Sequence, residues 1–492
     1  MDFINNFRNS VSKFLNNFFK LEERGSKISR ELIGGLTTFL AMAYILPVNS
    51  FMLSKTGMPF GGVFFATAVS AAVASIVMGL LANLPVALAP GMGLNAFFTF
   101  TLVNFGSGIS WQAALAAVFV SGVLFFIVSV TGLRKVVINA IPAGLKYAVG
   151  AGIGFFITFI GLKNAGIIVG GPTLVELGNL AHPTVLLGVF GILLVIILHS
   201  MGNKYSLIIS IAATAVVGLV LGAIAPEFFT YNWELLDETG AVIDSQDFLL
   251  MPAFGDQGLS DVLTGAKVTV FAAFDGFGEL FGSWSAITII FTLLFVDFFD
   301  TAGTLMAIGN QAGLVNDEGE IVGSEKALLV DSIGTMTGAL LGTSNVTSYI
   351  ESSTGIEQGA RTGLSSVVVG LLFLVSILAY PVLGLVTGVA VDVDGFGDWI
   401  YYSPVTAMAL VMVGTLMVGQ LKNVDWTDSA IVIPAFLTII MMMLTFSIAT
   451  GIAVGFIFYP VVKLAQGKGK EVNKVMYGLA VLFLINFILD SL

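Results

Sequence analysis

Apolar stretches recur along this chain from Leu32 to Phe458, and each has about the 17–25 residues that a helix needs to cross a bilayer. The composition agrees with this pattern, because 57% of the residues are hydrophobic and only 10% are charged. Soluble domains carry roughly 25% charged residues. The sequence therefore predicts an all-α polytopic membrane protein.

Loop charges predict how the chain threads the membrane. The apolar stretches divide into 14 expected spans. Seven lie on each side of a long acidic segment, 226–266, which contains no lysine or arginine. Cytoplasmic loops carry an excess of lysine and arginine. The cations before the first span therefore predict a cytoplasmic N-terminus: Arg8, Lys13, Lys20, Arg24, Lys27 and Arg30.

The two ends of the chain give weaker signals. Segment 3–25 is too polar for a signal peptide, and its apolar residues have helical spacing. We expect an amphipathic helix that lies on the membrane surface or packs on the protein's own cytoplasmic face. Segment 475–489 is expected to be an interfacial helix, a re-entrant piece or a fifteenth span. The apolar residues of the first segment are Phe3, Phe7, Val11, Phe14 and Phe18.

Several function classes are excluded by composition. The chain has no cysteine, so disulfide and thiolate chemistry is absent. Its two histidines, His182 and His199, lie near the ends of apolar runs and form no metal-binding motif. The net charge of −11 argues against a nucleic-acid partner. We expect no metal and no cofactor.

Two carboxylates stand inside apolar sequence. Asp300 lies in FTLLFVDFFDTAGTL (291–305) and Glu351 in LGTSNVTSYIESSTGI (341–356). An ionisable group near the bilayer centre costs about 2.5–3.5 kcal/mol on insertion scales, and it usually faces a polar cavity or pathway. The pair predicts a binding site within the membrane; the alternative is a structural hydrogen-bonding role.

Spacing suggests an internal repeat. The same 51 residues separate Tyr44 from Asn95 and Asp300 from Glu351, so an offset of 256 residues superimposes the two pairs. The first member of each pair lies in span 1 of its half, and the second lies in span 3. Many transporters consist of two inverted copies with the binding site between them, and two halves of seven spans each would have opposite orientations.

The third and tenth spans are poor uninterrupted helices. ALAPGMGLNAF (87–97) and GTSNVTSYIESSTG (342–355) are rich in Gly, Pro, Ser, Thr or Asn. We predict a short strand in each, about 86–93 and 343–349, that leads into a half-helix. Non-helical backbone at this depth must be buried in protein or line a cavity. The alternative is a pair of ordinary glycine-kinked helices.

At these residues the chain resembles the AzgA-like purine permeases of the nucleobase:cation symporter-2 (xanthine/uracil permease) family. The resemblance extends from about residue 25 to residue 490. It is carried by ELIGGLTTFLAMAYILPVN (31–49), ALAPGMGLNAFFTF (87–100), FVDFFDTAGTL (295–305), EKALLVDSIGTMTGALLGTSNVTSYIESSTGI (325–356), GARTGLSSVVVGLLF (359–373) and IPAFLTIIMMMLTFSI (433–448). The chain departs from this pattern at Thr450, where relatives often carry an acid, and in the long loop 226–266.

The resemblance implies the uracil-permease-like fold, in which 14 spans form 7+7 inverted repeats. That fold consists of a core domain (spans 1–4 and 8–11) and a gate domain (spans 5–7 and 12–14). We expect the two domains to move relative to each other by elevator-like alternating access. The expected divisions are an N-terminal amphipathic helix (1–30), a first core segment (31–135), a first gate segment (136–225), an acidic extracellular loop (226–283), a second core segment (284–390) and a second gate segment (391–492).

The resemblance also implies the site residues. Asp300 and Glu351 match the acids that bind the base, and Asn95 matches the Asn of the span-3 motif. Thr304 is one turn beyond Asp300, and Ile350 would contribute backbone groups. Tyr44 and Gly93 complete the predicted site.

Purine chemistry fits these residues. A carboxylate can accept two hydrogen bonds from one edge of a base, such as the N1–H and 2-amino groups of guanine, and charge strengthens them. Asn95 can donate and accept. The aromatic neighbours of the site either stack on the base or pack between helices: Phe97, Phe298, Phe299 and Tyr349.

A carboxylate that takes up a proton inside the membrane can serve as a proton carrier. We therefore expect proton symport, with Asp300 or Glu351 as the carrier. Asp297 is expected either to orient the site or to form a helix–helix hydrogen bond. Asp331 and Glu357 are expected to be structural or to lie near the cytoplasmic mouth.

The expected function is import of purine bases, namely guanine, hypoxanthine or adenine, through the cell membrane. One rival is an intramembrane aspartyl protease, suggested by the GxGD string at 395–398, but that string lies in an acidic loop. Another is an anion transporter of the same fold, which two acids disfavour. Related folds often dimerise, so a homodimer is also an expectation.

Overall fold

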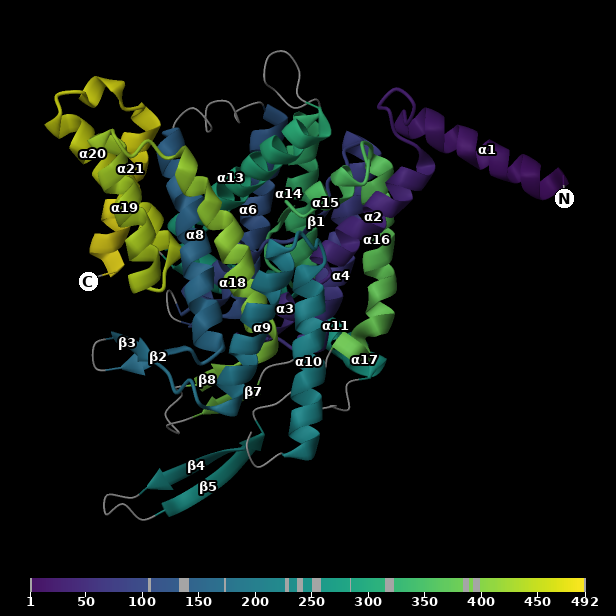
Figure 1. Ribbon diagram of the computed structural model, residues 1–492. Helices are drawn as coiled ribbons and strands as arrows, with labels where there is room; N and C mark the ends of the chain where they lie inside the picture. Colours follow the sequence, from purple (N-terminus) through teal and green to yellow (C-terminus); the bar gives the residue numbers. More distant parts are fainter. Residues whose placement is uncertain are drawn as a thin grey trace. The chain divides into compact units, whose positions relative to one another are not determined.

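A computed structural model describes residues 2–104, 108–131, 141–171, 174–225, 230–236, 242–249, 258–283, 285–314, 323–383, 389–392 and 399–490 (Figure 1). The chain divides into two compact units. The first contains Met1–Ile153, Ser260–Leu378 and Val418–Leu492, and the second contains Gly154–Leu259 and Ala379–Met417. The boundaries of these two units differ from those predicted for the core and gate domains. The division into core and gate domains stays a prediction.

The first unit is helical. Its helices are α1 (Asp2–Phe19), α2 (Ile28–Met42), α3 (Ile45–Ser54), α4 (Phe60–Val77), α5 (Met92–Ala96), α6 (Trp111–Thr131), α11 (Leu259–Thr269), α12 (Phe277–Gly282), α13 (Ala286–Ala312), α14 (Ser324–Leu341), α15 (Ser352–Glu357), α16 (Gly363–Ser376), α19 (Ser429–Leu444), α20 (Ile448–Ala465) and α21 (Lys474–Asp490). Two π-helical segments, Met78–Ala82 and Phe97–Asn104, extend α4 and α5.

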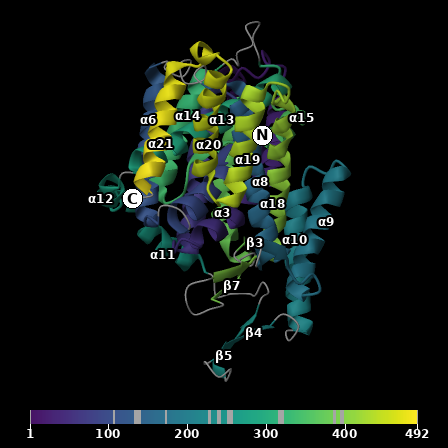
Figure 2. The ribbon, with the colours of Figure 1, turned by 90° about the vertical axis from the view of Figure 1, so that its left-hand side faces the viewer.

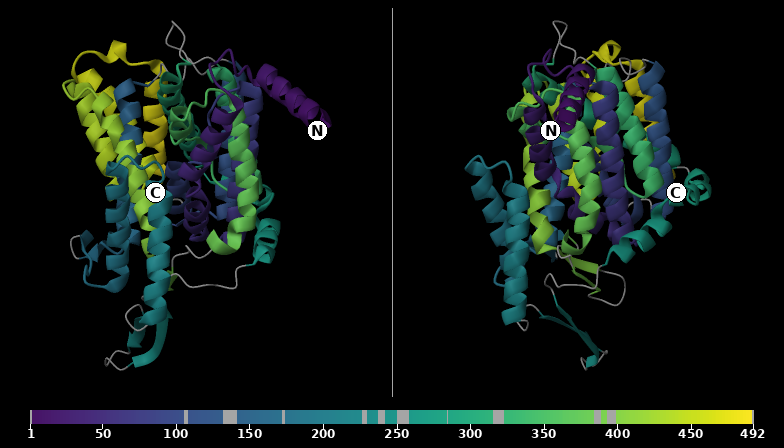
Figure 3. Two further views of the ribbon diagram at one scale, coloured as in Figure 1. Left: turned by 45° about the vertical axis from the view of Figure 1, so that its right-hand side comes forward. Right: turned by 90° about the vertical axis from the view of Figure 1, so that its right-hand side faces the viewer.

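The second unit contains α9 (Pro183–Ser200), α10 (Ser206–Ile224) and α17 (Tyr380–Leu383). Figure 3 shows α9 and α10 side by side. Two further helices, α8 (Ala143–Asn164) and α18 (Pro404–Val418), contribute residues to both units.

Nine helices in the described part of the chain are long and apolar enough to span a membrane. Four shorter apolar helices accompany them: Met92–Val103, Gly363–Ala379, Ser429–Leu444 and Lys474–Ile488. The expectation of a polytopic, mainly helical membrane protein is confirmed. The count of 14 spans and the inverted repeat stay predictions.

The strands only partly match the expectation. The two short strands predicted in the third and tenth spans are present as β1 (Leu88–Pro90) and β6 (Val346–Ser348). Three further antiparallel hairpins form outside those two segments, and the sequence did not predict them. The additional pairs are β2 (Ile168–Gly171) with β3 (Leu174–Leu177), β4 (Thr230–Leu236) with β5 (Val242–Leu249), and β7 (Val389–Asp392) with β8 (Trp399–Tyr402). β-Branched and aromatic residues favour strands in these short stretches.

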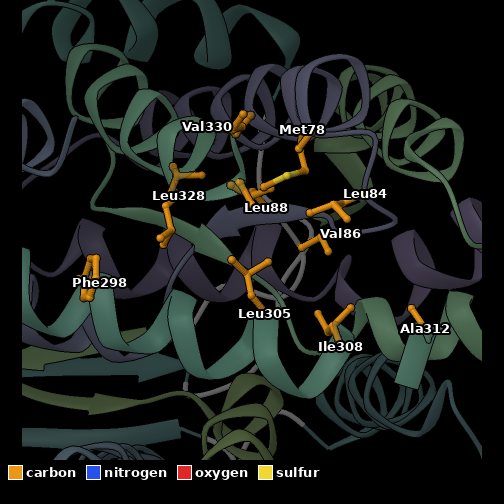
Figure 4. Close-up of a cluster of buried hydrophobic side chains, with 14 of the residues drawn as sticks. Met78, Leu84, Val86, Leu88, Phe298, Leu305, Ile308, Ala312, Leu328 and Val330 are labelled. Carbon is orange, nitrogen blue, oxygen red and sulfur yellow. The ribbon is translucent and has the colours of Figure 1, made fainter. Parts of the chain in front are cut away.

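The apolar core of the first unit lies around β1. Side chains from the π-helical segment after α4, from β1, from α13 and from α14 converge there (Figure 4). Phe298 of α13 belongs to this cluster and lies edge-on to Phe125 of α6, with ring centroids 5.5 Å apart. Removing apolar surface from water stabilises such a cluster by about 25 cal/mol per Å². The core therefore holds α13, the helix that carries Asp300, against its neighbours.

The N-terminal helix is present as predicted and projects from the helices of its unit (Figures 1 and 3). Val11, Phe14 and Phe18 are exposed on α1, whereas Phe19 is buried in a cluster with Leu364. Exposed apolar side chains are what binding to a membrane surface requires, and that location stays a prediction.

The C-terminal apolar segment forms α21, which runs beside α20 (Figure 2). Phe483 lies edge-on to Phe456 of α20 and Phe291 of α13, at centroid distances of 6.0 and 6.2 Å. Thr288 of α13 donates a hydrogen bond to Asn486 at 3.0 Å. The segment thus packs against the helix that carries Asp300.

Glu31 ties the first span to the loop before α16. Its side chain is completely buried. It accepts hydrogen bonds from the backbone N–H groups of Arg361 at 2.8 Å, Thr362 at 3.2 Å and Ser365 at 3.3 Å. A carboxylate is favourable beside these unpaired N–H groups at a helix N-terminus. The contact holds α16 against α2.

Candidate functional site

Two strands meet in the segments that were predicted as the third and tenth spans. β1 pairs antiparallel with β6, and Ala89 lies opposite Thr347. Backbone hydrogen bonds continue on both sides, from Tyr349 N–H to Ala87 O and from Gly91 N–H to Asn345 O, both at 2.9 Å. This pairing satisfies backbone groups that lipid could not. The prediction of strands in preference to kinked helices is confirmed.

The strands lead directly into short helices that carry predicted site residues. Glu351 is the residue before α15, and Asn95 lies in α5. Asp300 lies on α13 and receives a long hydrogen bond of 3.4 Å from Thr347 Oγ1 of β6. Glu351 follows the end of β6 by three residues, so both acids lie beside the paired strands. Both side chains are half-buried.

Tyr44 of the first span contacts Glu351. That span breaks between α2 and α3, and Tyr44 lies at the break. Its side chain is buried, and its hydroxyl donates a 2.8 Å hydrogen bond to Glu351 Oε1. The structure therefore brings together Tyr44, Asp300 and Glu351, three of the residues that sequence spacing paired.

The remaining predicted residues lie around this centre. Asn95 is completely buried; its Oδ1 accepts a short hydrogen bond from Ser344, and its Nδ2 faces Pro90 O at 3.5 Å. Its role in reading a base stays a prediction. Gly93 is half-buried, and a Cβ there would lie 2.6 Å from Ile153 Cγ2.

Two further predicted residues flank the acids. Thr304 is half-buried one helical turn after Asp300, and Ile350 is 40% exposed beside Glu351. Of the candidate aromatics, Phe97, Phe298 and Tyr349 are buried. Phe299 is only half-buried and carries Lys146 Nζ 5.0 Å from its ring centroid.

Asp297 makes the helix–helix hydrogen bond that was one of its two expected roles. The side chain is 1% exposed, and its Oδ2 accepts from Thr335 Oγ1 of α14 at 2.8 Å and from Asn345 Nδ2 at 2.9 Å. These contacts connect α13 to α14 and to the residue before β6. Asp297 therefore supports the helix that presents Asp300.

Asp331 of α14 is completely buried and is connected to Asp300 through Thr301 and Thr347. Its Oδ2 accepts from Thr301 at 2.6 Å, and its Oδ1 accepts from Ser348 at 3.4 Å. Glu357 accepts a hydrogen bond from Gln311 at 3.3 Å. Sequence reasoning missed Thr301 and Thr347, although the density of Ser, Thr and Asn in 343–348 was a signal for Thr347.

If this site binds a purine base, as the resemblance in the sequence implies, Tyr44→Phe should weaken that binding. The hydroxyl donates to Glu351 at 2.8 Å, and a hydrogen bond to a charged group is worth about 1.5–3 kcal/mol. The apparent affinity for hypoxanthine should fall by about tenfold, measured as KM for uptake. Tyr477→Phe is the matched control, because that hydroxyl donates to Gly469 O at 3.0 Å and does not contact the acids. An equal change in both variants would contradict a role for Tyr44 at the site.

Comparison with known proteins identifies the family. The Permease family model Xan_ur_permease matches residues 29–454. The guanine/hypoxanthine permease PbuG of Bacillus subtilis is 45% identical over 96% of this chain and 99% of its own length. The adenine permease AdeP of Escherichia coli is 39% identical over 96% of each chain.

Solved structures show the same fold at low sequence identity. The transmembrane domain of the cyanobacterial bicarbonate transporter BicA matches with a TM-score of 0.51 at 16% identity, covering 86% of this chain and 97% of that one. The murine anion transporter Slc26a9 in its inward-facing state matches with a TM-score of 0.58 at 11% identity, covering 89% of this chain and 69% of that one.

These findings agree with the apolar spans and with the resemblance in the sequence. The close relatives are permeases, which are transporters and not enzymes, and Asp398 of the GxGD string lies outside the described residues. The chain is a multi-pass membrane protein and belongs to the xanthine/uracil permease family.

Proposed function

We propose that this protein imports purine nucleobases, guanine and hypoxanthine first among them, by proton symport with elevator-like alternating access. The observation that carries the proposal is the position of two half-buried acids beside the paired strands β1 and β6: Asp300 accepts from Thr347 of β6, and Glu351, just beyond β6, accepts from Tyr44. Half-buried carboxylates inside a membrane protein need partners with positive or hydrogen-bond-donating character.

The N–H edge of a purine supplies such a partner. An ionised carboxylate accepts two hydrogen bonds from the N1–H and 2-amino groups of guanine, and N1–H of hypoxanthine offers one of them. A base without these donors leaves a buried acceptor unpaired, at about 1–3 kcal/mol. The names of relatives such as PbuG and AdeP support purine bases as the substrate class.

The rival function is anion transport, because the structural neighbours BicA and Slc26a9 are named as bicarbonate and anion transporters. Those similarities concern the fold alone. Here the predicted site contains two carboxylates, those of Asp300 and Glu351, and carboxylates repel an anion at short range. The hydroxyl of Tyr44 does not offset this repulsion, because it donates its hydrogen bond to Glu351.

Proton coupling is tested by uptake in vesicles. Asp300 or Glu351 would carry the proton inward together with the base, so an inward proton gradient should drive hypoxanthine accumulation about tenfold above equilibrium for one pH unit. Collapsing the gradient with a protonophore should abolish accumulation. Uptake that ignores the gradient would reject symport. Competition by adenine, guanine, xanthine and uracil in the same assay ranks the bases.

A further inference from the structure

Asp300 is connected to the buried Asp331 by two threonine hydroxyls. Thr347 Oγ1 lies 3.4 Å from Asp300 Oδ2, Thr301 Oγ1 lies 2.7 Å from Thr347 Oγ1, and Thr301 Oγ1 lies 2.6 Å from Asp331 Oδ2. The two threonines and Asp331 are at most 1% exposed. An unbroken chain of oxygens therefore runs from the half-buried acid into the protein interior.

The chain of oxygens is one hydrogen short. It has three oxygen–oxygen contacts, but each threonine hydroxyl brings only one hydrogen. If Thr347 donates to Asp300 and Thr301 donates to Asp331, no hydrogen is left between the two hydroxyl oxygens. A proton on either acid supplies the third hydrogen and makes every contact a hydrogen bond.

A second shortage of hydrogens lies next to it. Oδ1 of Asp297 and Oδ1 of Asn345 are buried and have no hydrogen-bond donor. Asp297 and Asn345 are at most 1% exposed, and Asp297 accepts a hydrogen bond from Thr335, one helical turn after Asp331. A buried acceptor without a donor costs about 1–3 kcal/mol. The buried acids Asp297 and Asp331 therefore also favour uptake of a proton.

The charges around Asp331 also favour uptake of a proton by these acids. Asp297 and Asp300 of α13 are the acids joined to the same helix as Asp331: Asp297 accepts from Thr335 of α14, and Asp300 is linked to Asp331 through the two threonines. The neighbouring elements α4, α6, β1 and β6 contain no titratable residue. The ion pairs Lys20–Glu23 and Lys463–Glu471 do not include these acids.

We propose that Asp331 is a proton-storage site, filled from Asp300 through the hydroxyls of Thr347 and Thr301. The proposal rests on proton symport and adds its internal route. A proton leaves Asp300 for Thr347 Oγ1 while the Thr347 hydrogen passes to Thr301 Oγ1 and the Thr301 hydrogen passes to Asp331 Oδ2. Three O–H bonds break and three form, and the negative charge moves from Asp331 to Asp300. An ionised Asp300 is then ready to accept hydrogen bonds from a base.

The test compares two activities of the full-length protein in proteoliposomes. One is hypoxanthine accumulation driven by an inward proton gradient, and the other is exchange of labelled for unlabelled hypoxanthine at equal pH. We expect Thr301→Val and Asp331→Asn to reduce accumulation by about tenfold or more and to retain exchange, because exchange needs the base site but no net proton transfer. Thr301→Ser keeps the hydroxyl and should restore accumulation.

Thr337→Val is the matched control, because its hydroxyl donates to Ile333 O within α14 and is outside the chain of oxygens. Wild-type accumulation in Thr301→Val would overturn the storage site. Equal loss of accumulation and exchange in Thr301→Val, with base binding intact, would also overturn it, because that result indicates a structural role. If the wild-type protein ignores the gradient, proton symport itself fails, which is a different result.

Discussion

Neutralising either central acid should abolish purine uptake. We expect Asp300→Asn and Glu351→Gln each to reduce kcat/KM for hypoxanthine by more than about 100-fold, because charge-assisted hydrogen bonds of roughly 1.5–3 kcal/mol each are lost. The substituted amide also presents an N–H group to the N–H edge of the base. Initial uptake rates in vesicles and calorimetric binding to the purified protein measure the two effects.

The control for this experiment removes one carboxylate from elsewhere in the chain. Asp425 is exposed in the loop before α19 and accepts hydrogen bonds from Thr427 at 2.9 and 2.6 Å. Those bonds lower the pKa of its carboxyl, and Asp425 is outside the proposed site. Asp425→Asn should transport normally. Wild-type KM in Asp300→Asn would mean that the base binds elsewhere.

The contact between the π-helical end of α4 and α16 should tolerate no added side chain. A Cβ on Gly363 would lie 2.1 Å from Gly79 O, and a Cβ on Gly79 would lie 2.3 Å from Gly363 O. Small residues allow membrane helices to approach this closely. Gly363→Val must separate the two backbones, because no flexible side chain can move aside. Overpacking costs about 1–3 kcal/mol and sometimes more.

We therefore expect Gly363→Val to lower the melting temperature of the purified protein strongly and to reduce the amount that folds. The readout is size-exclusion chromatography after heating in detergent. Gly478→Ala in α21 is the control, since a Cβ there has nothing within 4 Å and alanine favours a helix by about 1 kcal/mol. A Gly363→Val protein as stable as wild type would contradict the close approach of the helices.

Local sequence signals identified the breaks in the helical pattern. The Ser, Thr and Asn residues of 342–355 and the Gly and Pro residues of 87–97 predicted β6 and β1, because such residues are poor in helix interiors. The loop hairpins such as β4–β5 were missed. Strand pairing in a polar loop leaves no strong periodic signal, and neighbouring charged residues indicated an irregular segment.

Two helices in the first unit were also not foreseen. α11 and α12 lie within the segment 226–283 that was expected to be an acidic loop. Phe271, Phe274 and Phe281 are exposed along this stretch, and their rings form a stacked series with Phe277. The acidic residues earlier in the segment dominated its composition and hid the helical pattern that follows.

The sequence by itself determined that the chain crosses a membrane, belongs with purine permeases and holds two acids, Asp300 and Glu351, in apolar surroundings. These properties depend on local composition and motifs. Only the tertiary structure decided that Asp331 lies behind Asp300, because Thr301 and Thr347 come from different elements, 46 residues apart. Hydrogen bonds between distant segments depend on how helices pack, and no residue pattern along one segment records that packing.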